Sequence, residues 1–313
     1  MRARNAALVA VVSIAGLIGG CAADPFRTLT RPDLPNSIEL SATPFFPQEE
    51  YQCGPAALAT VLAYSGVAVH PDALIPQVYL PDRRGSLQPE LLAATRRYDR
   101  IPYVIPAEFP ALLAEVASGR PVLVLQNLGV RWAPAWHYAV VIGFSRERRE
   151  VILRSGIDER RTSSAAVFAR TWQRGGNWGV VALAAGELPA TEDSDGYLRA
   201  LAAAETAGRT DLSDPSYAAA AERWPDSSMA WLGLGNSAYA RDEREAAERM
   251  YRRALKADSG NAAALNNLAS TVAEQGRCDE ARKLLHTAMA LADLNPAMAA
   301  VLAQSWAEVE ACD

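Results

Sequence analysis

Residues 51–64 read Tyr-Gln-Cys-Gly-Pro-Ala-Ala-Leu-Ala-Thr-Val-Leu-Ala-Tyr. Gly54 permits a close turn, and Pro55 suits the first position of a helix because its missing N–H would have no partner there. The apolar residues that follow recur at helical spacing. The stretch therefore predicts a tight loop that runs into a helix. Cys53 would lie at the helix N-terminus, where unpaired N–H groups and the helix dipole favour a thiolate.

A histidine that can pair with this cysteine lies far along the chain. His137 is the second residue of 136–144, Trp-His-Tyr-Ala-Val-Val-Ile-Gly-Phe, an apolar run rich in β-branched residues that predicts a strand. A cysteine that opens a helix and a histidine that opens a distant strand are the two parts of a thiolate–imidazolium pair. Cys53 and His137 are therefore the candidate nucleophile and base.

The residues around this pair resemble the papain-like bacteriocin-processing (double-glycine) cysteine peptidase domain. The resemblance covers roughly residues 43–184 and rests on Gln48, on Gln-Cys-Gly-Pro-Ala-Ala-Leu at 52–58 and on His-Tyr-Ala-Val-Val-Ile-Gly at 137–143. It implies a nucleophilic cysteine, a histidine base and a glutamine that helps to form the oxyanion hole. Gln48 matches the family position for that glutamine, and Gln52 is its rival.

The fourth catalytic position departs from the family pattern. The family usually carries Asp-Pro at the end of the strand after the histidine hairpin, and that Asp orients the histidine. This chain reads Val-Ile-Leu-Arg-Ser-Gly at 151–156, so Ser155 takes the Asp position and Asp158 is the nearest carboxylate. Both are candidates for the orienting group. Trp132 and Trp136 flank the histidine and are candidates for the substrate groove, with core packing as the alternative.

The other segments of this region predict an α+β domain over 45–185. Helices are expected at 72–78, 88–98, 109–118 and 164–172, and further strands at 101–105, 121–126, 150–154 and 178–183. The charged residues 145–149 would form the turn of the histidine hairpin. Helices first and an antiparallel sheet later is an α+β order, which agrees with a papain-like cysteine peptidase fold.

Residues 194–313 predict helical repeats. Equivalent positions recur every 34 residues when repeats start at Ser194, Ser228 and Ala262, and the middle repeat is the most regular. The period resembles tetratricopeptide (TPR) repeats, each a helical hairpin, so the second domain is expected to be an all-α TPR superhelix. Residues 296–312 would form a closing helix over the last apolar face. The repeats imply a protein partner or substrate.

The start of the chain is similar to a bacterial lipoprotein signal. Two arginines precede an uncharged stretch, 6–20, that is too short for a comfortable transmembrane helix. The segment ends Leu-Ile-Gly-Gly-Cys at 17–21, which resembles a lipobox. Cleavage after residue 20 and lipidation of Cys21, with acyl chains such as palmitate, are therefore expected. A plain signal peptide or an uncleaved anchor is the alternative.

Two expectations follow for the segment after the signal. Ala22, and not Asp, follows the lipidated cysteine, so the usual inner-membrane retention signal is missing and an outer-membrane anchor facing the periplasm is favoured. The proline-rich residues 21–44 show little apolar periodicity and predict an extended tether between the membrane and the peptidase domain.

Composition and cysteine count narrow the function further. The 313 residues allow two domains, and the net charge of −5 argues against nucleic acid as a partner. The three histidines are scattered and no Cys/His spacing suggests a metal site, so no metal and no cofactor are expected. Cys278 and Cys312 are left over in an oxidising compartment. They are expected to form a disulfide between the second helix of the third repeat and the end of the closing helix.

These features together predict an envelope-associated cysteine peptidase, a hydrolase that cleaves a peptide or protein substrate through Cys–His thiolate chemistry. Two other hypotheses stay open. The missing Asp fits a catalytically weak or inactive papain-like module that binds peptides. A transglutaminase-like acyl transferase would use the same triad.

Overall fold

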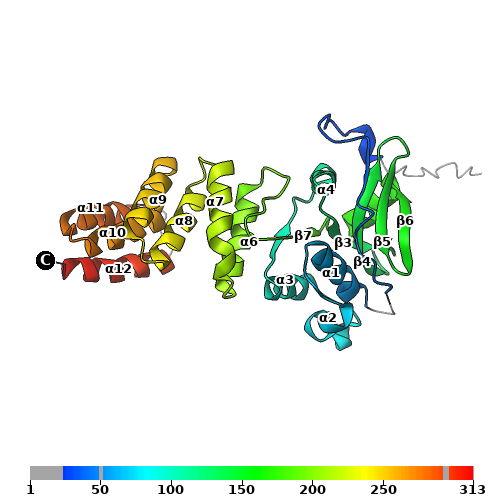
Figure 1. The fold of residues 1–313 in the computed structure, drawn as a ribbon, viewed down its shortest axis with the longest axis horizontal. Coiled ribbons are helices and arrows are strands. Elements are labelled where there is room, and N and C mark those ends of the chain that lie inside the picture. The colour runs from blue at the N-terminus through cyan, green and yellow to red at the C-terminus, as the bar shows by residue number, and fades with distance from the viewer. Residues whose placement is uncertain (1–23, 49–51, 292–295, 313) are drawn as a thin grey trace, which may run out of the picture.

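The structure is a computed structural model that describes residues 24–48, 52–291 and 296–312. A domain with a β-sheet lies at one end of an elongated molecule, and helices extend from it to the C-terminus (Figure 1). The predicted order, an α+β domain followed by an all-α domain, is confirmed.

The sheet is antiparallel, with the described strands in the order β2-β7-β3-β4-β5-β6 and β1 beside β4. Its strands are β1 (Ser37–Glu39), β2 (Ile101–Val104), β3 (Val122–Asn127), β4 (Trp136–Ser145), β5 (Glu150–Ser155), β6 (Asp158–Ser164) and β7 (Gly179–Leu183). The helices of this domain are α1 (Cys53–Tyr64), α2 (Pro71–Val78), α3 (Gln88–Arg97), α4 (Phe109–Ala117) and α5 (Ala165–Arg174), with short 3-10 turns at Pro25–Arg27 and Pro81–Arg83.

Successive side chains of β4 point to opposite faces of the sheet, and both faces are buried. This is expected for a strand in the middle of a layered domain. Val140 and Ile142 pack with α1, α2 and α3, whereas Ala139 and Val141 pack in the cluster that contains α4 and α5. Helix α1 is buried at every residue from 54 to 62, so it lies in the core and not on the surface. The strand and the helix that carry the candidate base and nucleophile are therefore both held rigidly.

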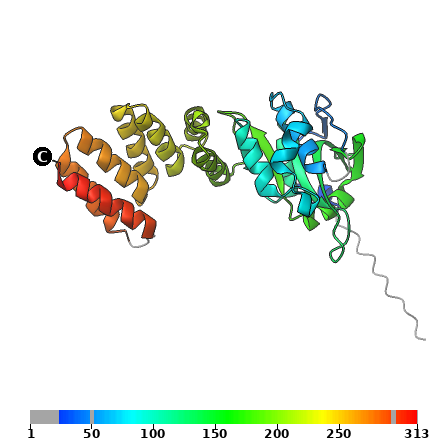
Figure 2. The ribbon, with the colours of Figure 1, turned by 90° about the horizontal axis from the view of Figure 1, so that it is seen from below.

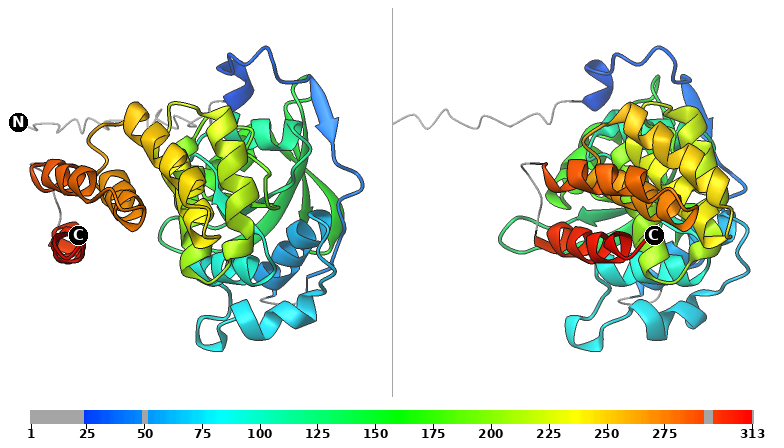
Figure 3. Two further views of the ribbon diagram at one scale, coloured as in Figure 1. Left: turned by 60° about the vertical axis from the view of Figure 1, so that its left-hand side comes forward. Right: turned by 90° about the vertical axis from the view of Figure 1, so that its left-hand side faces the viewer.

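The predicted tether is wrong for the residues from 24 onward. Phe26 packs its ring 5.3 Å from the ring of Phe109, and Leu34 is buried in the main core. Strand β1 pairs with β4, and Figure 3 shows this segment in dark blue along the sheet. A Cβ on Gly143 would lie 2.5 Å from the carbonyl oxygen of Ile38. Strand β1 can therefore approach β4 only because residue 143 is glycine. A few apolar side chains and a short backbone ladder hold this segment in place despite its many prolines.

Strand β6 is a second element that the sequence pattern does not reveal. Its residues, Asp-Glu-Arg-Arg-Thr-Ser-Ser, are nearly all exposed, because β6 is an edge strand. Charged side chains on an edge strand discourage pairing with another chain, so the polar composition hides the strand and protects it.

The C-terminal domain consists of successive antiparallel helix pairs that lead away from the sheet (Figure 2). Its helices are α6 (Ser194–Thr206), α7 (Ser213–Arg223), α8 (Ser228–Ala240), α9 (Arg244–Ala257), α10 (Ala262–Glu274), α11 (Cys278–Met289) and α12 (Pro296–Glu310), with a 3-10 turn at Thr210–Leu212. The first helix of each pair begins at the residue from which the 34-residue period was counted. The closing helix is two residues shorter than predicted.

The first helix pair is joined to the sheet domain by a continuous core and by polar contacts. Tyr197 of α6 and Tyr217 of α7 lie in the same buried cluster as the sheet. The buried carboxylate of Glu115 on α4 accepts a 2.8 Å hydrogen bond from the N–H of Ala190, in the segment before α6, and a second one from Arg120. The first repeat is therefore part of the folded unit that contains the sheet.

Cys278 and Cys312 are joined in a disulfide, with their Cα atoms 5.8 Å apart. The first opens α11 and the second follows α12, so the bond closes the end of the helical array as the sequence predicts. Arg282 of α11 also donates a 2.8 Å hydrogen bond to the carbonyl oxygen of Cys312.

Breaking this disulfide is expected to loosen α12 selectively, because a terminal helix frays unless it is held. Cys312→Ser should lower the local stability of residues 296–310 by about 2–4 kcal/mol, the usual contribution of a disulfide. Hydrogen exchange measured by mass spectrometry is the readout, with α1 as the internal control. Equal exchange of α12 in both proteins would show that helix packing alone holds it.

The predicted signal peptide and the lipidation site at Cys21 lie outside the described residues. Among the helices that the structure does describe, none combines the length and apolar character needed to cross a bilayer.

Candidate active site

A cavity of about 910 Å³ opens where the N-terminus of α1 meets the first residues of β4. Four residues singled out in the sequence line it, namely Gln48, Cys53, Trp136 and His137. They come from two parts of the chain, one that contains residues 48 and 53 and one at residues 136 and 137. The sheet and the buried helix therefore bring the candidate nucleophile, base and oxyanion donor to one concave site.

Cys53 is the first residue of α1, and its thiol is not in a disulfide. The next residue must be small, because a Cβ on Gly54 would lie 2.3 Å from the Oγ of Ser86 in the loop that covers the helix start. The backbone N–H of Tyr138 on β4 donates a hydrogen bond to the sulfur. The cysteine is therefore held against the strand that carries the histidine.

The pKa of the Cys53 thiol is raised from its ordinary value, chiefly because the thiol is buried. Hydrogen bonds from the backbone N–H groups of Tyr138, Gly54 and Cys53 itself act in the opposite direction but do not outweigh burial. The expectation from the sequence, that the helix N-terminus would favour a thiolate, is therefore wrong for the protein without bound substrate. Burial destabilises the thiolate by more than the backbone N–H groups at the helix start stabilise it.

His137 occupies the second position of β4, and its Nε2 lies 2.8 Å from the Oγ of Ser155 at the end of β5. Burial lowers the pKa of His137 to about 4, and the positive charge of Arg161 on β6 adds to this effect. The imidazole is consequently neutral at physiological pH. Since one ring nitrogen faces Ser155, Nδ1 is the nitrogen that can exchange a proton with the thiol.

The structure separates the two candidates for the orienting group. Ser155 is buried and contacts His137, whereas the side chain of Asp158 is 54% exposed and lies 3.6 Å from Arg161 in an ion pair. Asp158 begins β6 and makes no hydrogen bond with His137 among the contacts of the described residues, so the geometry favours Ser155 as the orienting group. A serine hydroxyl can hold the ring but carries no charge to stabilise an imidazolium.

Of the two glutamines, Gln48 lines the cavity and Gln52 does not. The backbone N–H of Gln48 donates a 3.1 Å hydrogen bond to the carbonyl oxygen of Gly156, which follows Ser155. The loop that carries the candidate oxyanion donor is thereby fastened to the end of the strand that orients the histidine.

Arg154 is a site residue that the sequence reasoning missed. It is buried beside Ser155, and its guanidinium group donates hydrogen bonds to the carbonyl oxygens of Ser41 and Thr43 at 2.8–3.1 Å. These bonds hold the segment that leads to Gln48 against β5. The available signal was a charged residue inside an otherwise apolar strand pattern.

The two candidate groove tryptophans have different positions. Trp136 lines the cavity with 58% exposure, but Trp132 does not line it and is 87% exposed at the tip of the β3–β4 loop. The buried side chain of Asn127 closes this loop at its base by accepting hydrogen bonds from the N–H groups of Gly129 and Ala135. The position of Trp136 next to the candidate base is therefore fixed, whereas Trp132 stays a candidate for contact beyond the cavity.

Within the described ranges, no group of three or more His, Cys, Asp or Glu side chains is arranged to hold a metal ion. The cavity around Cys53 brings a thiol and an imidazole together.

Parts of the chain are similar to known families and to a solved structure. Residues 40–180 match the model of the Peptidase C39 like family, and residues 143–313 match a tetratricopeptide repeat model. The chain is also similar to a solved structure described as a C39-like peptidase from Bacillus anthracis, with 17% sequence identity and a TM-score of 0.40 over 48% of this chain and 98% of that chain. No curated protein sequence matches the chain.

Proposed function

This chain belongs to the tetratricopeptide repeat family and carries a C39-like peptidase domain ahead of its repeats, and from this premise we propose that it is a cysteine peptidase. The observation that carries the proposal is the convergence of Cys53, His137 and Gln48 on one cavity, with Ser155 holding the imidazole. Its substrate would be a peptide or protein segment that reaches this cavity.

The geometry suggests a reaction that starts from a neutral pair. The thiol of Cys53 transfers its proton to Nδ1 of His137 as the sulfur attacks the scissile carbonyl carbon. The side chain of Gln48 and the backbone N–H of Cys53 stabilise the oxyanion. The imidazolium then protonates the leaving amine, which leaves an acyl-enzyme. His137 takes a proton from water, hydroxide attacks the thioester, and the proton returns to the departing sulfur.

One observation favours a second candidate function. Among the described residues, the hydrogen-bond partner of the imidazole is the neutral Ser155, and burial holds the pKa of His137 low. A site that forms the ion pair with difficulty could bind peptides and cleave them slowly or not at all. The peptidase and the peptide-binding module would use the same cavity and would differ in the rate at which they cleave the bound peptide.

The test is to incubate the full chain with a peptide library and to count new amino termini by mass spectrometry. New termini are expected with the wild type and not with Cys53→Ala, because the thiol is the proposed nucleophile. A chain that retains peptides in both forms without producing new termini would support the binding module. Amine-linked products in place of hydrolysed ones would identify an acyl transferase.

Two further parts of the proposal rest on the sequence. We propose that lipid on Cys21 anchors the chain to the bacterial envelope with its domains facing the periplasm. The Cys278–Cys312 disulfide supports an oxidising compartment, since disulfides are rare in the cytosol. The repeats, α6 to α12, would recruit a protein partner or present a substrate to the peptidase domain.

A further inference from the structure

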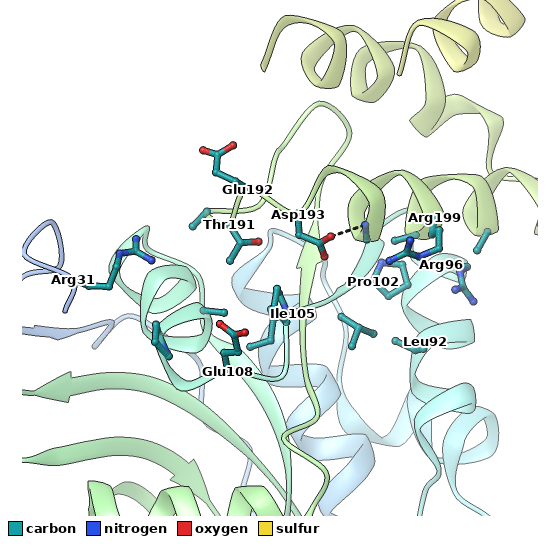
Figure 4. A pocket seen from close by; sticks show the side chains of 18 residues that line it. Arg31, Leu92, Arg96, Pro102, Ile105, Glu108, Thr191, Glu192, Asp193 and Arg199 are labelled. Atoms are coloured by element: carbon teal, nitrogen blue, oxygen red, sulfur yellow. Dashed lines mark hydrogen bonds between the residues drawn. The ribbon is translucent and has the colours of Figure 1, made fainter. Parts of the chain in front are cut away.

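A second cavity lies where α6 packs against the sheet domain (Figure 4). It has a volume of about 1000 Å³, and its walls come from α3, from β2 and the start of α4, and from α6 with the segment before it. None of its lining residues lines the cavity around Cys53. Junctions between domains are favoured places for ligand sites, and the side chains of this cavity determine which ligand it would select.

Two of the three acidic side chains that line this cavity are already occupied, and the third, Glu108 before α4, is drawn well apart from Arg96 and Arg199 in Figure 4. Asp193 accepts hydrogen bonds from the N–H of Gly196 at 2.9 Å, drawn as a dashed line in Figure 4, and from the hydroxyl of Tyr103 at 3.0 Å. Glu192 forms an ion pair with Arg223 outside the cavity. These two carboxylates therefore serve the fold and do not neutralise the cations of the cavity.

Two cations of the cavity lack such partners. Arg96 of α3 and Arg199 of α6 both line it, and neither guanidinium group makes a hydrogen bond or an ion pair with any residue that the structure describes. The Nε of Arg96 is fully buried, and burial lowers the pKa of this residue. Figure 4 places both arginines at the end of the cavity near Pro102 and Leu92. A partly buried cation without a partner is costly, so this end of the cavity favours an anion.

The backbone of β2 supplies a second kind of contact. Ile105 donates its N–H to Gly179 of β7, and by the antiparallel register Tyr103 also points its backbone toward β7. The backbone of Val104 therefore points away from β7, along the free edge of the sheet. Proline residues at 102 and 106 have no N–H to offer on this edge. One residue of an extended chain can pair with Val104, and a longer ladder cannot form.

We propose that this cavity binds the carboxyl-terminal end of an extended peptide. Its carboxylate lies between Arg96 and Arg199, one of its residues pairs with the backbone of Val104, and an apolar side chain rests on Leu92 and Ile105. A chain end suits the site better than a continuous strand, because pairing is limited to one residue. Arginine pairs with carboxylates through two parallel hydrogen bonds, which would satisfy the unpartnered guanidinium groups.

The test measures peptide affinity by fluorescence anisotropy with the full chain carrying Cys53→Ala, so that no probe is cut. The probe is a fluorescein-labelled Ala-Val-Ala-Val-Leu, prepared with a free carboxylate and with a carboxamide end. The free carboxylate is expected to bind at least about 10-fold more tightly, because a charge-assisted hydrogen bond is lost in the amide. Arg96→Gln and Arg199→Gln should each weaken the free-carboxylate probe by a similar factor, whereas the exposed Arg249→Gln serves as the matched control.

Arg199 is exposed on α6, so its replacement should leave the fold intact even if a change at Arg96 does not. Equal affinity for the two probes, or unchanged affinity in Arg199→Gln, would overturn the proposal. Loss of binding in Trp136→Ala with normal binding in the arginine variants would place the peptide in the Cys53 cavity instead. Displacement of the probe by octanoate at equal concentration would show a site for apolar anions and would overturn the assignment to a peptide end.

Discussion

Ser155→Asp is expected to raise turnover at pH 7 by roughly 10- to 100-fold, because a carboxylate beside the imidazole stabilises its charged form. An opposite charge within hydrogen-bonding distance shifts a pKa by about 1–3 units. The pKa of His137, held at about 4 by burial and by Arg161, would then rise toward neutrality. The thiolate–imidazolium pair would become easier to form, and the reaction would need less proton transfer during attack.

The pH dependence distinguishes this charge effect from simple orientation. In the wild type, the reactive neutral pair forms as His137 loses its proton near pH 4, so the rate should rise there and then stay level until the thiol ionises. In Ser155→Asp the rise should move to higher pH, because the carboxylate raises the pKa of the imidazole. Ser155→Asn is the matched control, because it keeps a hydrogen-bonding group without the charge. A pH profile of Ser155→Asp that coincides with that of Ser155→Asn would contradict the electrostatic explanation.

Asp158→Ala completes this comparison. The side chain of Asp158 is exposed and pairs with Arg161, so its removal should change turnover by less than about 3-fold, as expected for an exposed ion pair. A loss similar to that of His137→Ala would instead make Asp158 the third member of the catalytic group.

His137→Ala is expected to slow turnover by at least about 100-fold, the usual contribution of a general acid–base group. In the proposed reaction the imidazole takes the thiol proton and then protonates the leaving amine, and no other described histidine lines the Cys53 cavity. Turnover of the library-derived substrate is the readout. His286→Ala, which changes an exposed histidine on α11, is the control.

The same variant has a stability readout that needs no substrate. Unfolded histidine has an ordinary pKa near 6.5, whereas His137 in the folded chain has a pKa of about 4. Between these values the unfolded chain binds a proton that the folded chain does not, so stability falls as pH decreases from about 6.5 to about 4. The loss amounts to roughly 3 kcal/mol at the lower limit. His137→Ala should remove this contribution, and urea unfolding at pH 7 and pH 4.5 measures it. An acid sensitivity equal to the wild type would mean that the imidazole is not buried as a neutral group.

The local features of this protein follow from short stretches of its sequence. The Cys-Gly-Pro start of α1, the β-branched run of β4 and the 34-residue period of the helices are short-range patterns, and each sets the type of its element through backbone geometry and side-chain spacing. The repeat boundaries were predictable to the residue at Ser194, Ser228 and Ala262 because every helix pair repeats the same packing.

Tertiary structure alone decided the features that depend on distant neighbours. The segment before α1 proved to be folded because Leu34 and β1 find partners more than a hundred residues away. The choice of Ser155 over Asp158 depended on where the β5–β6 turn directs each side chain. The protonation of the Cys53–His137 pair depended on desolvation, which a sequence cannot display because burial belongs to the whole fold and not to any one stretch of it.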